Sequence, residues 1–345
     1  MAYPSPPPVS TATTTADDRR ATATISDIHS DVLETHILTR LNGRTLASAA
    51  CTSTQLHTLA SQESLWTNIC HSTWPSTALP RVRDIISTFP NGSRSFFSDS
   101  FPPADTAISG NQSSNHDNSS ELISAVDIYY KNKLIFSKVV ETETVSGWFI
   151  CSPFRIDLLD PKDTVATQMP HPNTDDTCQY LEDDLTLSWI IIDPIERRAM
   201  DLSSHRPVSV QRHWLSGEVQ VWFTTVLTGE KGSASEFVQC GIVVTCGRST
   251  EGEMRVIEVS LQVEDMDGMH LNGRDSLVIL ERTLEGKRGK TGRREAEGKR
   301  KFLEFQERKT ERKERRLRTE GALDMMCVAF GILGFTSLGL YIFCI

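Results

Sequence analysis

The chain has 345 residues, of which 38% are hydrophobic, and its formal net charge at pH 7 is −9. This length allows one sizeable domain and a small module, and the negative charge argues against nucleic-acid binding by the chain as a whole. The charge is uneven, because residues 287–318 hold 15 Lys or Arg against 6 Asp or Glu. An acidic body joined to a basic segment indicates two different surroundings.

Residues 1–24 are rich in Pro, Ser, Thr and Ala and contain no apolar run. This composition predicts disorder, and it argues against a secretory signal peptide. The 8 cysteines form no CxxC pair and no regular framework. We therefore expect free thiols in a reducing cytosol.

Residues 25–75 predict a run of short helices. Ser30 is expected to cap the first helix and Gly43 to end it. Later helices are indicated around Leu46 and Leu56, and a last one around Leu65 and Trp66. Five apolar residues of the first helix share one helical stripe, namely Val32, Leu33, Ile37, Leu38 and Leu41.

A helical unit of this size, roughly 50 residues, buries too little surface to be stable alone. Its apolar stripe therefore needs a cover. Two alternatives remain for what buries the stripe: residues 121–286 of the same chain, or a groove of a partner protein that takes up the helices.

The order of these helices resembles an F-box. The resemblance depends on Asp31-Val32-Leu33, Ile37-Leu38-Thr39-Arg40-Leu41, Leu46-Ala47-Ser48-Ala49-Ala50-Cys51 and Leu65-Trp66-Thr67-Asn68-Ile69-Cys70. The last block, which is similar to the LWxxlC ending of F-boxes, is the most specific. Ile28-His29 replaces the usual Leu-Pro opening, Cys51-Thr52-Ser53-Thr54 replaces Cys-Lys-x-Trp, and the gap before Ile37 is about one residue longer than the common pattern. Residues 29–74 are also similar to a plant F-box subfamily with a C-terminal hydrophobic tail.

The resemblance implies that residues 25–75 dock on the Skp adaptor of a cullin–RING ubiquitin ligase. The side chains that it assigns to this contact are Ile28, Val32, Leu33, Ile37, Leu38, Leu41, Leu46, Leu65 and Trp66. Residues 76–120 are expected to be a linker, with one short helix near Val82–Ile86 and disorder from 102 to 120.

Residues 121–286 contain eight or nine apolar runs of strand length, from LISAVDIYY to SLVILERTL. Their alternation, as in Val219, Val221 and Phe223, predicts an antiparallel sandwich or barrel. Loops 160–181 and 228–235 are the expected binding surface, for a protein or a carbohydrate. We expect the four tryptophans of this domain to be core residues, namely Trp148, Trp189, Trp214 and Trp222.

Two motifs imitate ligand sites. Gly286–Thr291 resembles a phosphate loop, but Leu284 stands where the first glycine is needed. Asp265 and Asp267 could belong to a calcium loop, yet their spacing fails the EF-hand pattern and predicts a hairpin turn. HExxH, GxSxG and zinc-type spacing are absent from the sequence. We therefore expect no cofactor, metal or enzyme activity.

Residues 287–321 form the basic neck, and residues 322–345 are expected to cross a membrane. Met325–Ile345 carries no charge, and its 21 residues as a helix would span about 30 Å, the thickness of a hydrocarbon core. The positive-inside tendency keeps the body in the cytosol, which predicts a tail anchor in a membrane that the sequence does not name.

The fold class expected from these parts is α+β, with a helical F-box, an antiparallel β domain and a transmembrane helix. Two functions follow. The first is a substrate-recruiting F-box subunit, which works by proximity and recruits an unknown protein substrate, with no nucleic acid involved. The second is a non-ubiquitin, tail-anchored binding or trafficking protein whose helical module packs internally.

Overall fold

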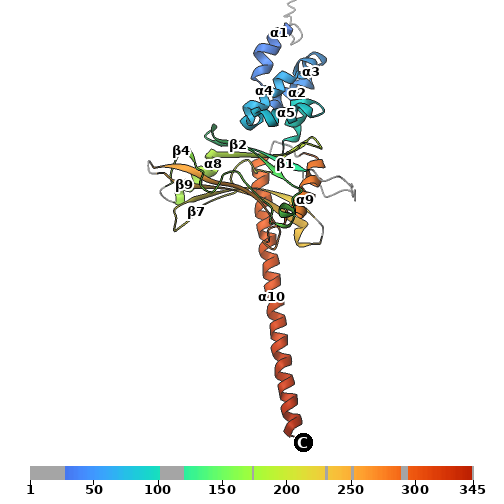
Figure 1. Ribbon diagram of the computed structural model, residues 1–345, viewed down its shortest axis with the longest axis vertical. Helices are drawn as coiled ribbons and strands as arrows, with labels where there is room; N and C mark the ends of the chain where they lie inside the picture. Colours follow the sequence, from blue (N-terminus) through green and yellow to red (C-terminus); the bar gives the residue numbers. More distant parts are fainter. Residues whose placement is uncertain are drawn as a thin grey trace, which may run out of the picture. The chain divides into compact units, whose positions relative to one another are not determined.

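The computed structural model describes residues 28–101, 120–172, 175–229, 232–249, 252–288 and 294–343 (Figure 1). The expected disorder at residues 1–24 and over most of 102–120 lies outside these ranges. The chain forms two compact units that divide between Gln62 and Glu63. The helical N-terminus, the antiparallel sheets and the long apolar C-terminal helix confirm the expected α+β fold.

The first unit contains one irregular helix and two short α-helices. The irregular helix consists of α1 (Ser30–Val32), the π-helical turn η2 (Leu33–Ile37) and the 3₁₀ turn η3 (Leu38–Arg40). Helices α2 (Gly43–Ala50) and α3 (Thr54–Ala60) follow.

Two cap residues differ from the prediction. His29 rather than Ser30 caps α1, because its side chain accepts from the Asp31 N–H. Gly43 does not end a helix but begins α2, since the Asn42 side chain accepts from the Thr45 N–H at 2.9 Å. An Asn at this position satisfies a free N–H of the first turn, which starts a helix instead of stopping one.

The second unit begins with α4 (Glu63–Thr73), η4 (Pro75–Ala78), α5 (Pro80–Thr88) and α6 (Gly92–Asp99). Residues 76–101 were expected to be a linker with one short helix, and the structure instead folds most of them into helices. They share a buried apolar cluster with one face of a sheet. The cluster consists of Cys70, Trp74, Val82, Ile85, Ile86, Phe89 and Phe96 from the helices, and Ile123, Ala125, Ile190, Ile192 and Ala199 from the strands.

This cluster changes the limits of the β domain. A fragment of residues 121–286 would leave the strand side of the cluster uncovered, because its helical cover lies between Cys70 and Phe96. Exposed apolar surface of this kind lowers stability and promotes aggregation. A stable fragment therefore has to start at or before Glu63.

The β domain consists of two antiparallel sheets. The four-stranded sheet has the order β2-β1-β5-β6, and the other has the order β3-β10-β9-β8-β7 with β4 also paired to β10. The strands are β1 (Glu121–Tyr130), β2 (Lys133–Glu143), β3 (Arg155–Asp157), β4 (Val165–Pro170), β5 (Leu185–Asp193), β6 (Arg198–Asp201), β7 (Ser209–Arg212), β8 (Val219–Thr228), β9 (Phe237–Arg248) and β10 (Glu253–Glu264).

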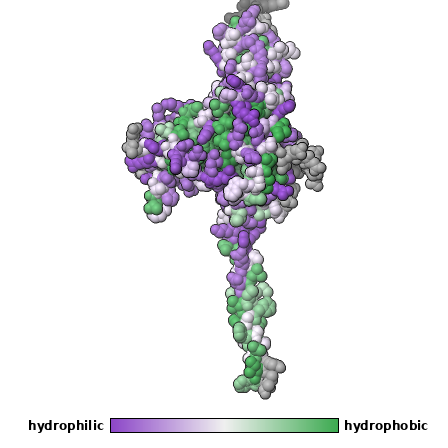
Figure 2. Space-filling model, in the orientation of Figure 1, coloured by the Kyte–Doolittle hydropathy of each residue, from purple (hydrophilic) through white to green (hydrophobic). Residues whose placement is uncertain are grey.

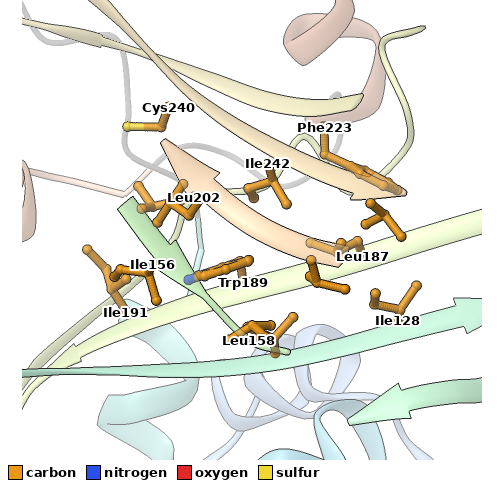
Figure 3. Close-up of a cluster of buried hydrophobic side chains, with 14 of the residues drawn as sticks. Ile128, Ile156, Leu158, Leu187, Trp189, Ile191, Leu202, Phe223, Cys240 and Ile242 are labelled. Carbon is orange, nitrogen blue, oxygen red and sulfur yellow. The ribbon is translucent and has the colours of Figure 1, made fainter. Parts of the chain in front are cut away.

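The main core lies between the two sheets, which makes this domain a sandwich rather than a closed barrel. Figure 3 shows Trp189 and Leu187 of β5 among side chains from the other sheet, including Phe223 and Ile242. Trp189 is fully buried, and its indole N–H donates to Ser124 Oγ at 3.1 Å. A buried indole needs such an acceptor, since an unsatisfied N–H in the core is costly.

One expected strand is helical and another is partly helical. All of SLVILERTL lies in α9 (Gly273–Glu285). Of the expected run GWFICSPFRIDLL, Gly147–Cys151 form α7 and Arg155–Asp157 form β3. Asn272 caps α9 by accepting from the Asp275 N–H at 2.8 Å. Leu277, Leu280 and Leu284 are buried at helical spacing. A third helix, α8 (Asp175–Asp184), lies where a loop was expected.

A buried carboxylate fixes the helical segment to the sheet. Asp127 of β1 is 1% exposed and accepts from the Ser76 N–H at 3.0 Å and from the Ser76 hydroxyl at 2.6 Å. Ser137 of β2 also donates to it at 2.6 Å. Burial raises the pKa of the Asp127 carboxyl in spite of these donors, because the ionised form loses its hydration.

We expect D127A to lower the free energy of unfolding by about 2 kcal/mol or more, because Ser76 and Ser137 lose their acceptor. D127N should cost less and remove a pH dependence. A folded pKa above the unfolded value means that stability is lost as pH rises from about 4 through the raised pKa. The melting temperature of D127N relative to wild type should therefore increase between pH 4 and pH 7, and a constant difference would contradict the raised pKa.

Arg288, from the glycine-rich motif that imitates a phosphate loop, is a structural residue. Its guanidinium donates to carbonyl oxygens of Asp99, Ala199 and Leu284, and also to those of Thr283 and Gly286. It thereby joins the ends of α6 and α9 to β6. Burial lowers the pKa of Arg288 to about 10.

We expect R288M to lower the free energy of unfolding by about 2–4 kcal/mol, because several buried carbonyls lose a charged donor at once. R288K should be intermediate, since an ammonium cannot reproduce the geometry of the guanidinium fork. Denaturant unfolding of the three proteins measures the order, and equal stability of wild type and R288M would contradict it.

Helix α10 (Arg294–Phe343) contains most of the basic neck and most of the apolar tail. Its first half packs on the β domain: Phe305 is buried, Arg312 pairs with Asp267 at 2.7 Å, and Lys309 pairs with Glu264. Beyond Leu323 its apolar side chains are exposed, and Figure 2 shows them covering the end of the helix. The stretch is long and apolar enough to cross a membrane, and none of it is buried.

Candidate functional site

In the first helix the buried residues Leu33 and Leu38 are five residues apart, a spacing that does not place two side chains on one face of a regular α-helix. The Leu38 N–H donates to the Leu33 carbonyl, which is the i to i+5 bond of a π-helix. In an α-helix, residues five apart would lie about 140° apart around the axis, because 3.6 residues make a turn. The wider π turn brings Leu33 and Leu38 to one face, and both are buried. The π turn covers Leu33–Ile37, where the sequence was expected to be about one residue longer than the common F-box pattern.

The nine predicted docking residues separate into two groups. Ile28, Val32 and Ile37 are exposed, at 36%, 43% and 39%, and we call them the apolar ridge. Leu41 is half-buried. The other five side chains are at most 5% exposed, namely Leu33, Leu38, Leu46, Leu65 and Trp66. Among the nine residues, the ridge therefore supplies the exposed apolar side chains, and the other five are buried within the fold.

Helix α4 supplies the last two predicted residues and joins them to the second unit. The Trp66 ring lies 5.4 Å from the Phe97 ring between centroids, and the Arg94 guanidinium lies 5.8 Å from the Trp66 centroid. The thiol of Cys70 donates to the Ser93 carbonyl, and burial raises the pKa of this thiol to about 12. The end of the F-box pattern is therefore continuous with the helices that cover the sheet.

In the β domain, the tryptophans and the loop 160–181 follow the prediction only in part. Trp189 is a core residue as expected, but Trp148 and Trp214 are 83% and 86% exposed. Strand β4 and helix α8 occupy much of the expected loop 160–181. Sequence periodicity could not locate these exposed rings, because Trp148 in the five-residue α7 and Trp214 in a turn lie in segments too short for a pattern.

The acidic turn 265–268 is a hairpin turn with its own hydrogen bonds. Asp265 accepts from the N–H groups of Asp267 and Met269, each at 2.9 Å. Asp267 is paired with Arg312, which neutralises it. Across the described ranges, no group of three or more His, Cys, Asp or Glu side chains could hold a metal ion.

Comparison with known proteins identifies the family. The F-box-like family model matches residues 33–72. The chain is 54% identical over 323 residues to the probable F-box protein At2g36090 of Arabidopsis thaliana, which covers 93% of each chain. The chain belongs to the F-box protein family.

Two further relatives are also similar over nearly the whole length of the chain. F-box protein At2g27310 of Arabidopsis thaliana is 44% identical over 326 residues, covering 92% of this chain and 96% of the relative. F-box protein At3g44326 of the same plant is 45% identical over 338 residues, covering 94% of this chain and 93% of the relative. The similarity therefore includes the β domain. No solved structure matches the chain significantly.

Proposed function

We propose that this F-box protein is the substrate-recruiting subunit of an SCF-type cullin–RING ubiquitin ligase, tethered to a membrane by its C-terminal helix. The observation that carries the proposal is the apolar ridge of Ile28, Val32 and Ile37, which lies within or beside the matched F-box residues and is 36–43% exposed. An apolar helix face of this kind fits a groove on a partner, here the Skp-type adaptor.

The chain then acts by proximity rather than by chemistry of its own. The adaptor end connects it to the ubiquitin-charged enzyme, and the β domain presents the bound substrate. Linking two binding modules raises the effective concentration of one partner near the other, commonly into the millimolar range for short connections. The apolar cluster shared by α4 and the sheet supports this role, because Cys70 of α4 and Ile123 of β1 belong to the same buried cluster.

The contacts of α10 fix the distance of the β domain from the membrane. We count from Arg312, which pairs with Asp267 of the β domain, to Met325, where the uncharged stretch begins. Thirteen helical residues correspond to about 20 Å. We infer that the β domain is held about 20 Å above the cytosolic face, where it selects membrane proteins or proteins bound to that membrane.

An alternative is a tail-anchored binding or trafficking protein without a ligase. The packing of α4 within the second unit favours it, because part of the helical module is already covered internally. Co-expression with the Skp adaptor separates the two functions. A stable one-to-one complex of the full chain with the adaptor, measured by light scattering in detergent, supports the ligase subunit, and two separate species support the alternative.

Target choice is tested by proximity labelling with the proteasome inhibited. Wild type should label ubiquitylated proteins of its own membrane, and a Δ322–345 variant should lose them. If both proteins labelled the same soluble set, the tail would have no role in target choice.

A further inference from the structure

Strand β2 is the outermost strand of the four-stranded sheet and, among the described strands, pairs only with β1. It is 11 residues long. In an antiparallel sheet, alternate residues of such a strand point their N–H and C=O groups away from the neighbour. Long edges with apolar residues invite the addition of another strand, and proteins usually block them. Here Leu134 on this edge is 40% exposed.

A groove of about 470 Å³ runs along this edge. One wall is Leu134–Lys138, and the other is Leu159 together with Asp163–Val165. Side chains alternate between the faces of a strand, so a depression on a sheet face is lined by every second residue. Five consecutive residues line this groove, which places it beside the main chain of β2. Its volume lies in the range of roughly 300–1,000 Å³ that is typical of ligand clefts.

The groove is lined by apolar and polar side chains, and its charged residues are Lys138 on β2 and Asp163 on the opposite wall. Ile135, Leu159 and Val165 are half-buried in it. Two other charged residues of β2 have partners, since Lys133 contacts Gln168 and Glu141 lies 3.5 Å from Arg81. Within the described part of the chain, Lys138 has no hydrogen-bond or ion-pair partner.

We propose that the β2 edge binds an extended peptide segment by adding it to the sheet as a strand. The N–H and C=O groups of the peptide pair with those of β2, its apolar side chains fill the groove, and an acidic side chain lies opposite Lys138. The proposal rests on the proposed function only in taking this segment to be part of the recruited substrate. Peptide binding itself does not require the F-box.

The probe is a phage-displayed library of random dodecapeptides, selected on the full chain in detergent micelles. Enriched peptides are then synthesised in two forms, with methyl groups on one or the other alternate set of backbone nitrogens. Only one set faces β2, so we expect one form to bind at least tenfold more weakly and the other to bind unchanged. Amide hydrogen exchange of residues 133–143 should slow when the unmethylated peptide is bound.

Charge reversal tests the position of the peptide. K138E should weaken binding of an acidic peptide at least tenfold, and replacing the acidic residue of the peptide by Lys should restore it. R274E is the matched control, because Arg274 is exposed on α9 and does not line the groove. Melting temperatures of both variants show whether the fold is kept.

Three results would overturn the proposal: no enrichment of peptides, equal effects of the two methylation patterns, or dimers of the chain in which a second copy occupies β2. Adaptor binding is measured on the same sample. Loss of the adaptor with intact peptide binding would reject the ligase function and leave the groove assignment standing.

Discussion

V32D and I37D should each weaken binding of the Skp adaptor about a hundredfold while leaving the protein folded. Both side chains lie on the apolar ridge, where an Asp remains hydrated in the free chain but loses water in the complex. An unpaired carboxylate at such an interface costs about 3 kcal/mol, and 1.4 kcal/mol corresponds to a tenfold change in affinity. Isothermal titration with the purified adaptor measures the loss.

Two controls separate binding from folding. L38D introduces a charge at a side chain that is 1% exposed, so it should unfold the helices as well as abolish binding. S87D adds the same charge at an exposed position of α5, a helix of the second unit, and should change neither property. If V32D and I37D bound the adaptor as tightly as S87D, the ridge would not be the docking surface.

Removal of the residues after Glu320 should release the protein from membranes. The full chain is expected to resist alkaline carbonate extraction, and the truncated chain should be recovered in the supernatant. The truncation keeps Phe305 and Arg312, so the contacts of α10 with the β domain remain and the truncated protein should melt as the wild type does. Recovery of the full chain in the carbonate supernatant would disprove the anchor.

A second truncation tests whether residues 294–320 of the neck stabilise the fold. Ending the chain at residue 293 removes Phe305, which is 2% exposed, and the pairs with Glu264 and Asp267. Loss of a buried Phe side chain typically costs about 3–5 kcal/mol. This shorter protein should therefore have a lower melting temperature than the chain that ends at Glu320.

The structure shows where local patterns were sufficient. Three features are visible in residues that are close together in the sequence. They are the apolar spacing of the F-box helices, the alternation of Val219, Val221 and Phe223, and the uncharged run of the tail. Such patterns report which side of an element is buried, and they do so before any tertiary contact is known. They accordingly predicted the family and the antiparallel sheets correctly, and the structure and the comparisons confirmed both.

The failures occurred where an apolar run has two possible structures. Residues 276–284 suit a strand by composition, yet the Asn272 cap and the burial of Leu277, Leu280 and Leu284 make them a helix. Helix and strand periods are hard to tell apart over so short a run. Residues 76–101 were misjudged for a related reason, because their helices are stabilised by the sheet face beneath them.

The residues of the F-box helices and the membrane-length tail could be found from the chain alone, because their signals are carried by neighbouring side chains. The sequence could not show which of the nine predicted docking residues are exposed, since the π turn at Leu33–Ile37 changes the face on which each side chain lies. The β2 edge and its groove also required the tertiary structure. An edge strand differs from a central strand in the neighbour it lacks, and that neighbour is determined by contacts between residues far apart in the sequence.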